Sequence, residues 1–163
     1  MDSKETLRAT PDVMGHWRWT TAGEPVFAHE DDMAGPRLGR PARVLIVEDD
    51  HLVAMHIEAA LLDAGFEVVG IAATAEEATA LASTERPVVA IMDIRLSGAR
   101  DGVDAALGLF KQFGLRSIFA TAHQDAGTRL RAEPAHPLGW LSKPYQPDAL
   151  VHALRRAFDE LDT

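Results

Sequence analysis

The hydrophobic and polar positions from residue 42 onward follow two patterns, short apolar runs and longer amphipathic stretches. The apolar runs predict five strands, which cover Arg43–Val47, Glu67–Ala72, Val88–Met92, Arg116–Thr121 and Leu138–Leu141. The first and third contain continuous apolar runs, as is typical of strands that helices cover on both faces. Short strands that alternate with helical patterns indicate βαβ units and a parallel sheet.

The stretches between these strands predict about five helices. The first, His51–Ala64, carries apolar residues at helical spacing, namely Leu52, Met55, Ala59 and Leu62. Asp50 precedes it and is expected to be its N-cap. The other helices are expected in the Ala-rich stretch after Thr74, from Asp101 through Phe113, over Ala126–Ala132, and from Pro147 to Leu161.

The first 41 residues differ from the rest of the chain. Prolines and glycines, among them Thr10-Pro11 and the stretch Gly35–Pro41, break up any long element. Residues 1–41 are therefore predicted to be an N-terminal extension, either a flexible tail or a small docking element with a hairpin formed by His16–Thr20 and, beyond a turn signal, Val26-Phe27. Residues 42–163 are expected to form one domain, and no effector domain is expected after it.

Composition limits the possible functions. The 163 residues suffice for one domain with a real core and a modest appendage. The formal net charge of −9 argues against non-specific nucleic-acid binding, and the absence of cysteine excludes disulfides and thiolate metal sites. No apolar stretch reaches membrane-spanning length and the N-terminus lacks a signal-peptide core, so the expected location is the cytoplasm, with no membrane partner.

Polar side chains stand at the ends of four of the five predicted strands. They are Glu48, Asp49 and Asp50 after the first strand, Asp93 after the third, and Thr121 and Lys143 at the fourth and fifth. In an α/β sheet, ligands bind just outside the carboxyl ends of the strands, where the strand order reverses. These residues therefore predict one polar crevice.

The residue types in this crevice indicate phosphoryl transfer. Asp49 and Asp93 would repel each other unless a cation lies between them, and Mg²⁺ is the cation that suits a phosphate-handling site with oxygen ligands. Asp93 is then a candidate nucleophile that forms an acyl phosphate. The Lys143 ammonium would neutralise charge on the phosphoryl group, and the Thr121 hydroxyl would bond to one of its oxygens.

The acidic pair Glu48-Asp49, the acceptor Asp93, the hydroxyl of Thr121 and Lys143 before a proline resemble the receiver domain of two-component response regulators, over about residues 42–161. The resemblance implies a flavodoxin-like fold, a doubly wound five-stranded parallel sheet of order 2-1-3-4-5. It also implies that Asp93 takes a phosphoryl group from a phosphohistidine of a sensor histidine kinase. The expected protein is thus a regulator that catalyses only its own phosphorylation and dephosphorylation.

The same resemblance assigns roles to further residues. Mg²⁺ would be held by Asp49, Asp93 and the backbone carbonyl of Arg95, with Glu48 acting through water. Trp140 stands where the family carries a switching Tyr or Phe. Arg95 and His123 each lie two positions past a site residue and flank the route of the attacking water, so we hypothesise that they set the lifetime of the phosphorylated state.

Two departures resemble the FAT GUY subgroup of receivers. The loop from Ile94 to Gly102 lacks the usual proline and is one residue longer than the common form, and Phe119-Ala120-Thr121 matches the Phe-Ala-Thr stretch. This resemblance implies a stand-alone regulator paired with an HWE-type histidine kinase.

Several alternatives stay open at this point. The regulator could signal through protein contact, as a monomer or a phosphorylation-dependent dimer, or serve as a phosphate sink that drains a shared kinase. A more distant alternative is an aspartyl-nucleophile phosphatase of the haloacid dehalogenase type, which requires a general acid where Arg95 stands. A nucleotide-binding domain is disfavoured because no Gly-rich phosphate loop follows the first strand.

Overall fold

The computed structural model describes residues 8–11, 17–20, 42–122 and 124–163. The chain divides into two compact units, residues 1–34 and 35–163. In the first unit, strand β1 (Arg8–Pro11) pairs antiparallel with strand β2 (Trp17–Thr20). The sequence predicted a hairpin that contains Trp17–Thr20, but the observed partner strand is Arg8–Pro11, and the expected second arm, Val26-Phe27, lies outside the described residues. Its role as a docking element stays a prediction.

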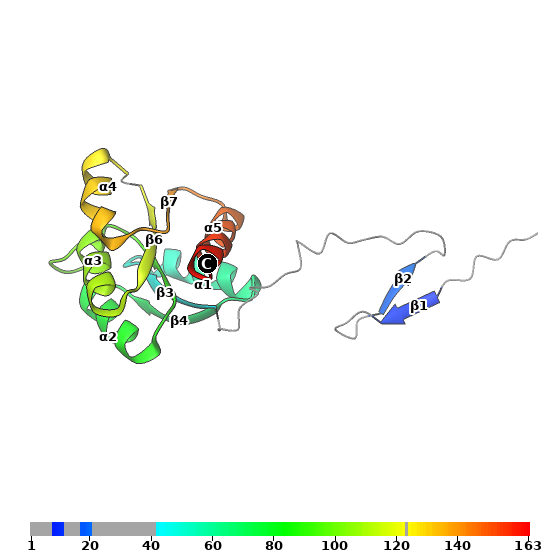
Figure 1. Cartoon of the computed structure of the whole chain (residues 1–163). Coiled ribbons are helices and arrows are strands. Elements are labelled where there is room, and N and C mark those ends of the chain that lie inside the picture. The colour runs from blue at the N-terminus through cyan, green and yellow to red at the C-terminus, as the bar shows by residue number, and fades with distance from the viewer. Residues whose placement is uncertain (1–7, 12–16, 21–41, 123) are drawn as a thin grey trace, which may run out of the picture. The chain divides into compact units, whose positions relative to one another are not determined.

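The second unit is built on a five-stranded parallel sheet (Figure 1). Its strands, in spatial order, are β4 (Glu67–Ala72), β3 (Arg43–Val47), β5 (Val89–Met92), β6 (Arg116–Thr121) and β7 (Gly139–Ser142). Counted along the chain from residue 42 this is the order 2-1-3-4-5, so the predicted fold class is confirmed. Three strands have the predicted bounds; β5 begins one residue later than expected, and β7 is shifted by one residue.

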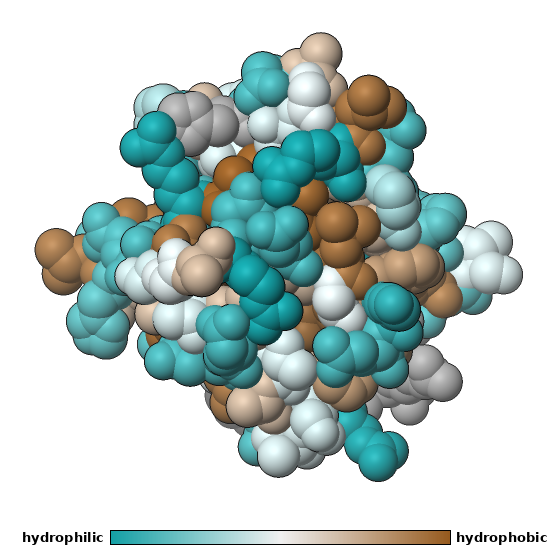
Figure 2. Space-filling model, turned by 90° about the vertical axis from the view of Figure 1, so that its left-hand side faces the viewer, coloured by the Kyte–Doolittle hydropathy of each residue, from teal (hydrophilic) through white to brown (hydrophobic). Residues whose placement is uncertain are grey.

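Helices cover both faces of this sheet (Figure 1). They are α1 (His51–Asp63), α2 (Ala75–Glu85), α3 (Gly102–Phe113), α4 (Ala126–Ala132) and α5 (Pro147–Leu161), with a 3-10 turn η2 (Glu133–Ala135) after α4. Within the described ranges, no helix is both long and apolar enough to cross a membrane. The surface over α3 mixes hydrophilic residues with scattered apolar ones (Figure 2).

The sheet separates two hydrophobic clusters. Along β3, Leu45 and Val47 point into the cluster that α2 and α3 complete, while Val44 and Ile46 point into the cluster that α1 and α5 complete. Successive side chains of a strand face opposite sides, so a strand between two helical layers is apolar at nearly every position, and the buried Ser117 of β6 is an exception. This explains the continuous apolar runs in the sequence.

Side-chain caps set the beginnings of the helices near the site. Asp50 is the N-cap of α1, as predicted, and its Oδ1 accepts hydrogen bonds from the backbone N–H groups of Leu52 and Val53. Asp101 caps α3 and forms a reciprocal capping box with Asp104. Both caps satisfy N–H groups that have no partner inside the helix.

Helix α1 exposes the apolar residues whose spacing helped to predict it. Leu52 is 68% exposed, Met55 49% and Leu62 55%. The side that packs against the sheet carries Ala54, Ile57 and Leu61 instead. The helix therefore has two apolar stripes, and only one of them is covered in this structure.

Candidate phosphoacceptor site

The carboxyl ends of the strands are held in register by backbone hydrogen bonds just beyond the sheet. The N–H of Glu48 donates to the carbonyl of Ala72, and the N–H of Asp93 donates to that of Val47, both at 2.9 Å. The N–H of Lys143 donates to the carbonyl of Thr121 at 3.0 Å. Residues that lie up to 95 positions apart in the sequence are thus fixed at one edge of the sheet.

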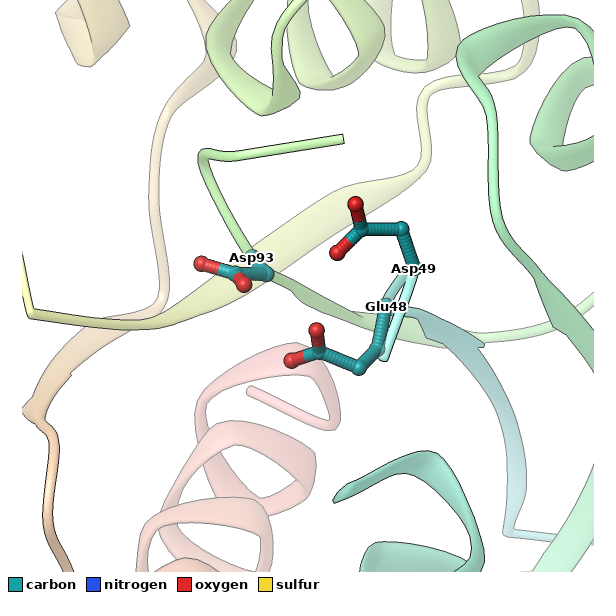
Figure 3. Close-up of side chains that lie close together, drawn as sticks. All are labelled: Glu48, Asp49 and Asp93. Atoms are coloured by element: carbon teal, nitrogen blue, oxygen red, sulfur yellow. The ribbon is translucent and has the colours of Figure 1, made fainter. Parts of the chain in front are cut away.

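Three carboxylates meet at this edge. Glu48 and Asp49 follow β3 and Asp93 follows β5, and one oxygen of each lies within 4.8 Å of the others (Figure 3). Glu48 is 3% exposed and Asp93 8%, whereas Asp49 is open to solvent. Oxygen donors grouped in this way suit a hard divalent cation, and the exposed side leaves room for the water ligands that Mg²⁺ retains.

Lys143 provides the positive charge at the site. Its Nζ donates to Glu48 Oε2 at 2.7 Å and to Asp93 Oδ2 at 3.0 Å. Burial alone would lower the pKa of Lys143, but the hydrogen bonds to these two carboxylates outweigh burial and raise it. The ammonium therefore stays charged at neutral pH and partly compensates the carboxylates.

Burial dominates the electrostatics of Glu48. It raises the pKa of this carboxyl group above the usual range, because the charged form loses water. Hydrogen bonds from Lys143 and from the backbone N–H of Asp50, at 3.1 Å, act in the opposite direction. A buried carboxylate with only partial compensation favours the arrival of a further cation.

The Asp93 carboxylate is held by two donors. Its Oδ1 accepts from the backbone N–H of Ile94 at 2.7 Å, and its Oδ2 accepts from Lys143. Thr121 is buried at the end of the neighbouring strand β6, 1% exposed. Asp49, Asp93, Thr121 and Lys143 thus stand at the ends of four adjacent strands, β3, β5, β6 and β7.

Gly102 is a site residue that sequence reasoning did not single out. A Cβ at this position would lie 1.8 Å from the backbone carbonyl oxygen of Asp93, and the N–H of Gly102 donates to the carbonyl of Ile94 at 2.7 Å. The first residue of α3 is therefore packed directly on the backbone of Asp93. A glycine after the N-cap Asp101 was the only available signal.

Ser97 was also missed. Its Oγ donates to Asp49 Oδ2 at 3.4 Å, and its N–H donates to the carbonyl of Ala73 at 3.2 Å. These contacts connect the loop after Asp93 to the carboxylate on the neighbouring strand. A serine in a polar loop has no sequence signal that would have identified it.

Three further residues were assigned to switching and rate control. The Trp140 ring stacks on Phe119, with ring centroids 4.5 Å apart and planes at 18°, and the Arg129 guanidinium carbon lies 4.8 Å from its centroid. Arg95 is exposed, and His123 lies outside the described residues. The roles of Trp140, Arg95 and His123 stay predictions.

A mostly apolar groove of about 440 Å³ opens beside Lys143. It lies between α1, which contributes Val53 and Ile57, the segment after β7, which contributes Tyr145, and α5, which contributes Leu150. Burial raises the pKa of Tyr145. The Lys143–Pro144 peptide bond that leads into this segment is cis.

Comparison with curated proteins finds relatives among bacterial regulators. The phyllosphere-induced regulator PhyR of Methylorubrum extorquens is 37% identical over 119 residues, which cover 71% of this chain and 44% of PhyR. The transcriptional regulatory protein PdtaR of Mycobacterium tuberculosis is 34% identical over 117 residues, which cover 72% of this chain and 57% of PdtaR. The chain spans about half the length of these relatives.

Solved structures and a family model agree with these relatives. The receiver domain of a modulated diguanylate cyclase from Desulfovibrio desulfuricans G20 matches with a TM-score of 0.68 and 38% identity, over 74% of this chain and 98% of that one. The response regulator PhyR of Brucella abortus matches with a TM-score of 0.64 and 35% identity, over 74% of this chain and 49% of that one. The family model "Response regulator receiver domain" matches residues 44–155. The chain therefore belongs to the response regulator receiver domain family.

Proposed function

We propose that this receiver domain accepts a phosphoryl group on Asp93 from a phosphohistidine of a sensor histidine kinase and transmits the signal through protein contact. The observation that carries the proposal is the position of Asp93. Its nearly buried carboxylate lies both in a three-carboxylate cluster and within 3.0 Å of the Lys143 ammonium. Phosphoryl transfer depends chiefly on such positioning and charge neutralisation.

The donor set fits Mg²⁺, and we assign the metal to this cluster. Asp49 and Asp93 would ligate it directly with the backbone carbonyl of Arg95, and Glu48 would act through water. When bound, the ion would neutralise charge on the phosphoryl oxygens. A cation at this position would offset the repulsion between the three carboxylates, whose oxygens lie within 4.8 Å of one another.

The chain's own residues then have distinct tasks. A carboxylate oxygen of Asp93 forms a bond to phosphorus while the bond to the donor imidazole breaks, and the imidazole leaves. Lys143, already hydrogen-bonded to Asp93, neutralises an oxygen of the transferred group. The Thr121 hydroxyl bonds to another of these oxygens. This chemistry produces a phosphorylated regulator and not a turnover enzyme.

The loss of the phosphoryl group sets the duration of the signal. We propose that Arg95 and His123 control access of the attacking water, so that alanine at both positions changes the dephosphorylation rate. Trp140 is the candidate switch. A swing of its ring would break its contacts with both Phe119 and Arg129, so any switching must also involve α4.

The surface beside the site suits a helical phosphodonor protein. Leu52, Met55 and Leu62 are exposed on α1. Together with Ala59 they recur at intervals of three and four residues, which is the spacing of a helix-packing seam. The apolar groove next to Lys143 begins on the same helix. A kinase helix packed on α1 would bring its phosphohistidine to the edge of the sheet where Asp93 lies.

The output is proposed to be a protein contact. A solved relative from Bartonella quintana, 31% identical with a TM-score of 0.63, is described as the anti-anti-sigma factor PhyR, and this chain covers 49% of it. By analogy, phosphorylation would change which partner this chain binds. The competing proposal is a phosphate sink, and the decay rate of phospho-Asp93 separates the two.

The test is intact-mass analysis after incubation with Mg²⁺ and acetyl phosphate, with Asp93→Asn as the matched variant. We expect one phosphoryl adduct on the wild type, none on Asp93→Asn and none in EDTA. Rapid decay of the adduct would favour the sink, and slow decay the relay. A wild type that takes no phosphoryl group from acetyl phosphate or from a purified histidine kinase would refute the proposal.

A further inference from the structure

Helix α4 depends on side-chain contacts for its position. It has only seven residues, Ala126–Ala132, and of these only Ala132 is buried. Helices this short are not stable in isolation, because too few hydrogen bonds offset the cost of nucleation. The contacts of its two arginines, Arg129 and Arg131, therefore decide where the helix lies.

Arg131 forms ion pairs with the beginning of α3. Its Nη1 and Nη2 both lie 3.0 Å from Asp101 Oδ2, and Nη2 also lies 3.3 Å from Asp101 Oδ1 and 3.4 Å from Asp104 Oδ1. The planar guanidinium fork matches a carboxylate in this geometry. We call Arg131, Asp101 and Asp104 the α3–α4 ion-pair cluster.

The titration behaviour of the pair agrees with the geometry. Burial alone would raise the pKa of Asp101, but the backbone N–H of Asp104 and the Arg131 guanidinium outweigh burial and lower it. The pKa of Arg131 is raised, first by its hydrogen bond to Asp101. Both groups are thus stabilised in their charged forms by the contact.

The α3–α4 ion-pair cluster is joined directly to the phosphoacceptor. Asp101 is followed by Gly102, whose Cα packs on the backbone carbonyl of Asp93 and whose N–H donates to the carbonyl of Ile94. The loop after Asp93 therefore ends at the residue that Arg131 holds. A rearrangement of this loop around a phosphoryl group on Asp93 that extends to Asp101 would strain the ion pair.

A second contact joins α4 to the strand that ends in Thr121. Arg129 lies over Trp140 and its Nη2 donates to Gln124 Oε1 at 2.6 Å, while Trp140 stacks on Phe119, two positions before Thr121. Between the two arginines lies Leu130, which is 66% exposed. A shift of α4 would therefore change an apolar surface available to a partner.

We propose that Arg131 is a positioning residue whose pair with Asp101 stabilises the unphosphorylated arrangement of both the loop after Asp93 and α4. The inference rests on the proposed phosphorylation of Asp93. If phosphorylation of Asp93 weakens this pair, reciprocity requires that loss of the pair favours phosphorylation. The ion pair thus connects the phosphoacceptor to the helix that displays Leu130.

The test compares Arg131→Gln, Asp101→Asn and the double variant with the wild type. Asparagine caps a helix about as well as aspartate, so Asp101→Asn removes the charge and keeps the cap. Arg100→Gln is the matched control, because it breaks another exposed ion pair of the same loop, with Glu76, that does not involve α4. The rate of adduct formation with acetyl phosphate and Mg²⁺ is measured by intact mass, and amide hydrogen exchange in α4 is measured in EDTA.

We expect both single variants to accept phosphoryl groups about two- to fivefold faster than the wild type, since exposed ion pairs contribute modestly. The double variant should match the single variants, α4 should exchange faster in all three, and Arg100→Gln should resemble the wild type. Phosphorylation at the wild-type rate in Arg131→Gln and Asp101→Asn would overturn the inference, even if α4 exchanged faster. A wild type without any adduct would instead refute the proposed function on which the inference rests.

Discussion

The ammonium nitrogen of Lys143 lies 3.0 Å from the carboxylate of Asp93, although the two residues are 50 positions apart in the sequence. The strand ends that carry them are separated by β6 in the sheet, and the long lysine side chain spans this distance. The same nitrogen reaches Glu48 at 2.7 Å. One cation thus compensates two nearly buried carboxylates.

Replacement of Lys143 by methionine should destabilise the domain in the absence of Mg²⁺. Loss of one partner of a buried ion pair costs about 3–5 kcal/mol, and because Lys143 is partly exposed we expect about 1–3 kcal/mol. Urea unfolding followed by circular dichroism in EDTA measures this loss. Addition of Mg²⁺ should stabilise Lys143→Met more than the wild type, since the ion replaces the missing charge. Equal stability of Lys143→Met and the exposed control Lys111→Met would contradict the expectation.

Asp49 and Asp50 provide a matched pair for the metal assignment. Asp49→Asn and Asp50→Asn make the same charge change at adjacent positions, but only Asp49 belongs to the carboxylate cluster, whereas Asp50 caps α1. We expect Asp49→Asn to weaken Mg²⁺ binding by about tenfold or more, in line with losses seen at metal sites. The dependence of the thermal midpoint on Mg²⁺ concentration reports this affinity. An equal loss in Asp50→Asn would mean that only the general negative charge attracts the ion.

Gly102→Ala should be strongly destabilising, because its Cβ would overlap the backbone carbonyl of Asp93. The expected loss is about 2–4 kcal/mol, as for other substitutions that overpack a rigid site. Gly108→Ala, in the interior of the same helix, meets only the Gln112 side chain at 3.9 Å and should gain about 0.5–1 kcal/mol from helix propensity. Denaturant midpoints compare the two. A Gly102→Ala protein as stable as the wild type would show that the close packing is not required.

The exposed stripe of α1 should matter for a protein donor and not for a small one. We expect Leu52→Ser combined with Met55→Ser to reduce phosphotransfer from a purified histidine kinase by about fivefold or more, the effect of removing a significant interface residue. Phosphorylation by acetyl phosphate should stay unchanged. Phe113→Ser, also exposed but on α3, is the control. Equal losses with both donors would indicate damage to the site itself.

The ion pair between Asp101 and Arg131 predicts a pH dependence of stability. The pKa of Asp101 is lowered from its ordinary value of 3.8, so the unfolded chain binds a proton more readily than the folded one. Its contribution is therefore complete well above pH 3.8 and is lost as the pH falls through 3.8 toward the lower folded pKa. The difference in unfolding free energy between wild type and Arg131→Gln should be present at pH 7 and shrink below pH 4. A difference independent of pH would exclude this charge as its source.

The fold and the centre of the site were predictable because each depends on local patterns. Arg43–Val47 and Glu67–Ala72 were located without error from their apolar runs, since strands between two helical layers are mostly apolar. Once the strands are parallel, the residues after them must meet at one edge. Asp93 and Lys143 were therefore predictable as neighbours although no local signal connects them.

Other features required the tertiary structure. The sequence of α1 contains two apolar stripes, and only packing decides that Ile57 is covered while Leu52 is not. The contact of Arg131 with Asp101 joins two residues 30 positions apart in the sequence, and surface charges carry no pattern that identifies their partners.

The sequence by itself determined the parallel sheet and the identity of the residues at its carboxyl edge, because the periodicity of hydrophobic positions and the ends of strands are local properties. The tertiary structure decided that Lys143 compensates both Glu48 and Asp93, that Gly102 packs on the backbone of Asp93, and that arginines hold α4. Each of these is a distance between side chains or backbones from different elements. Such distances depend on how the helical layers pack on the sheet, and no single segment of the chain encodes this packing.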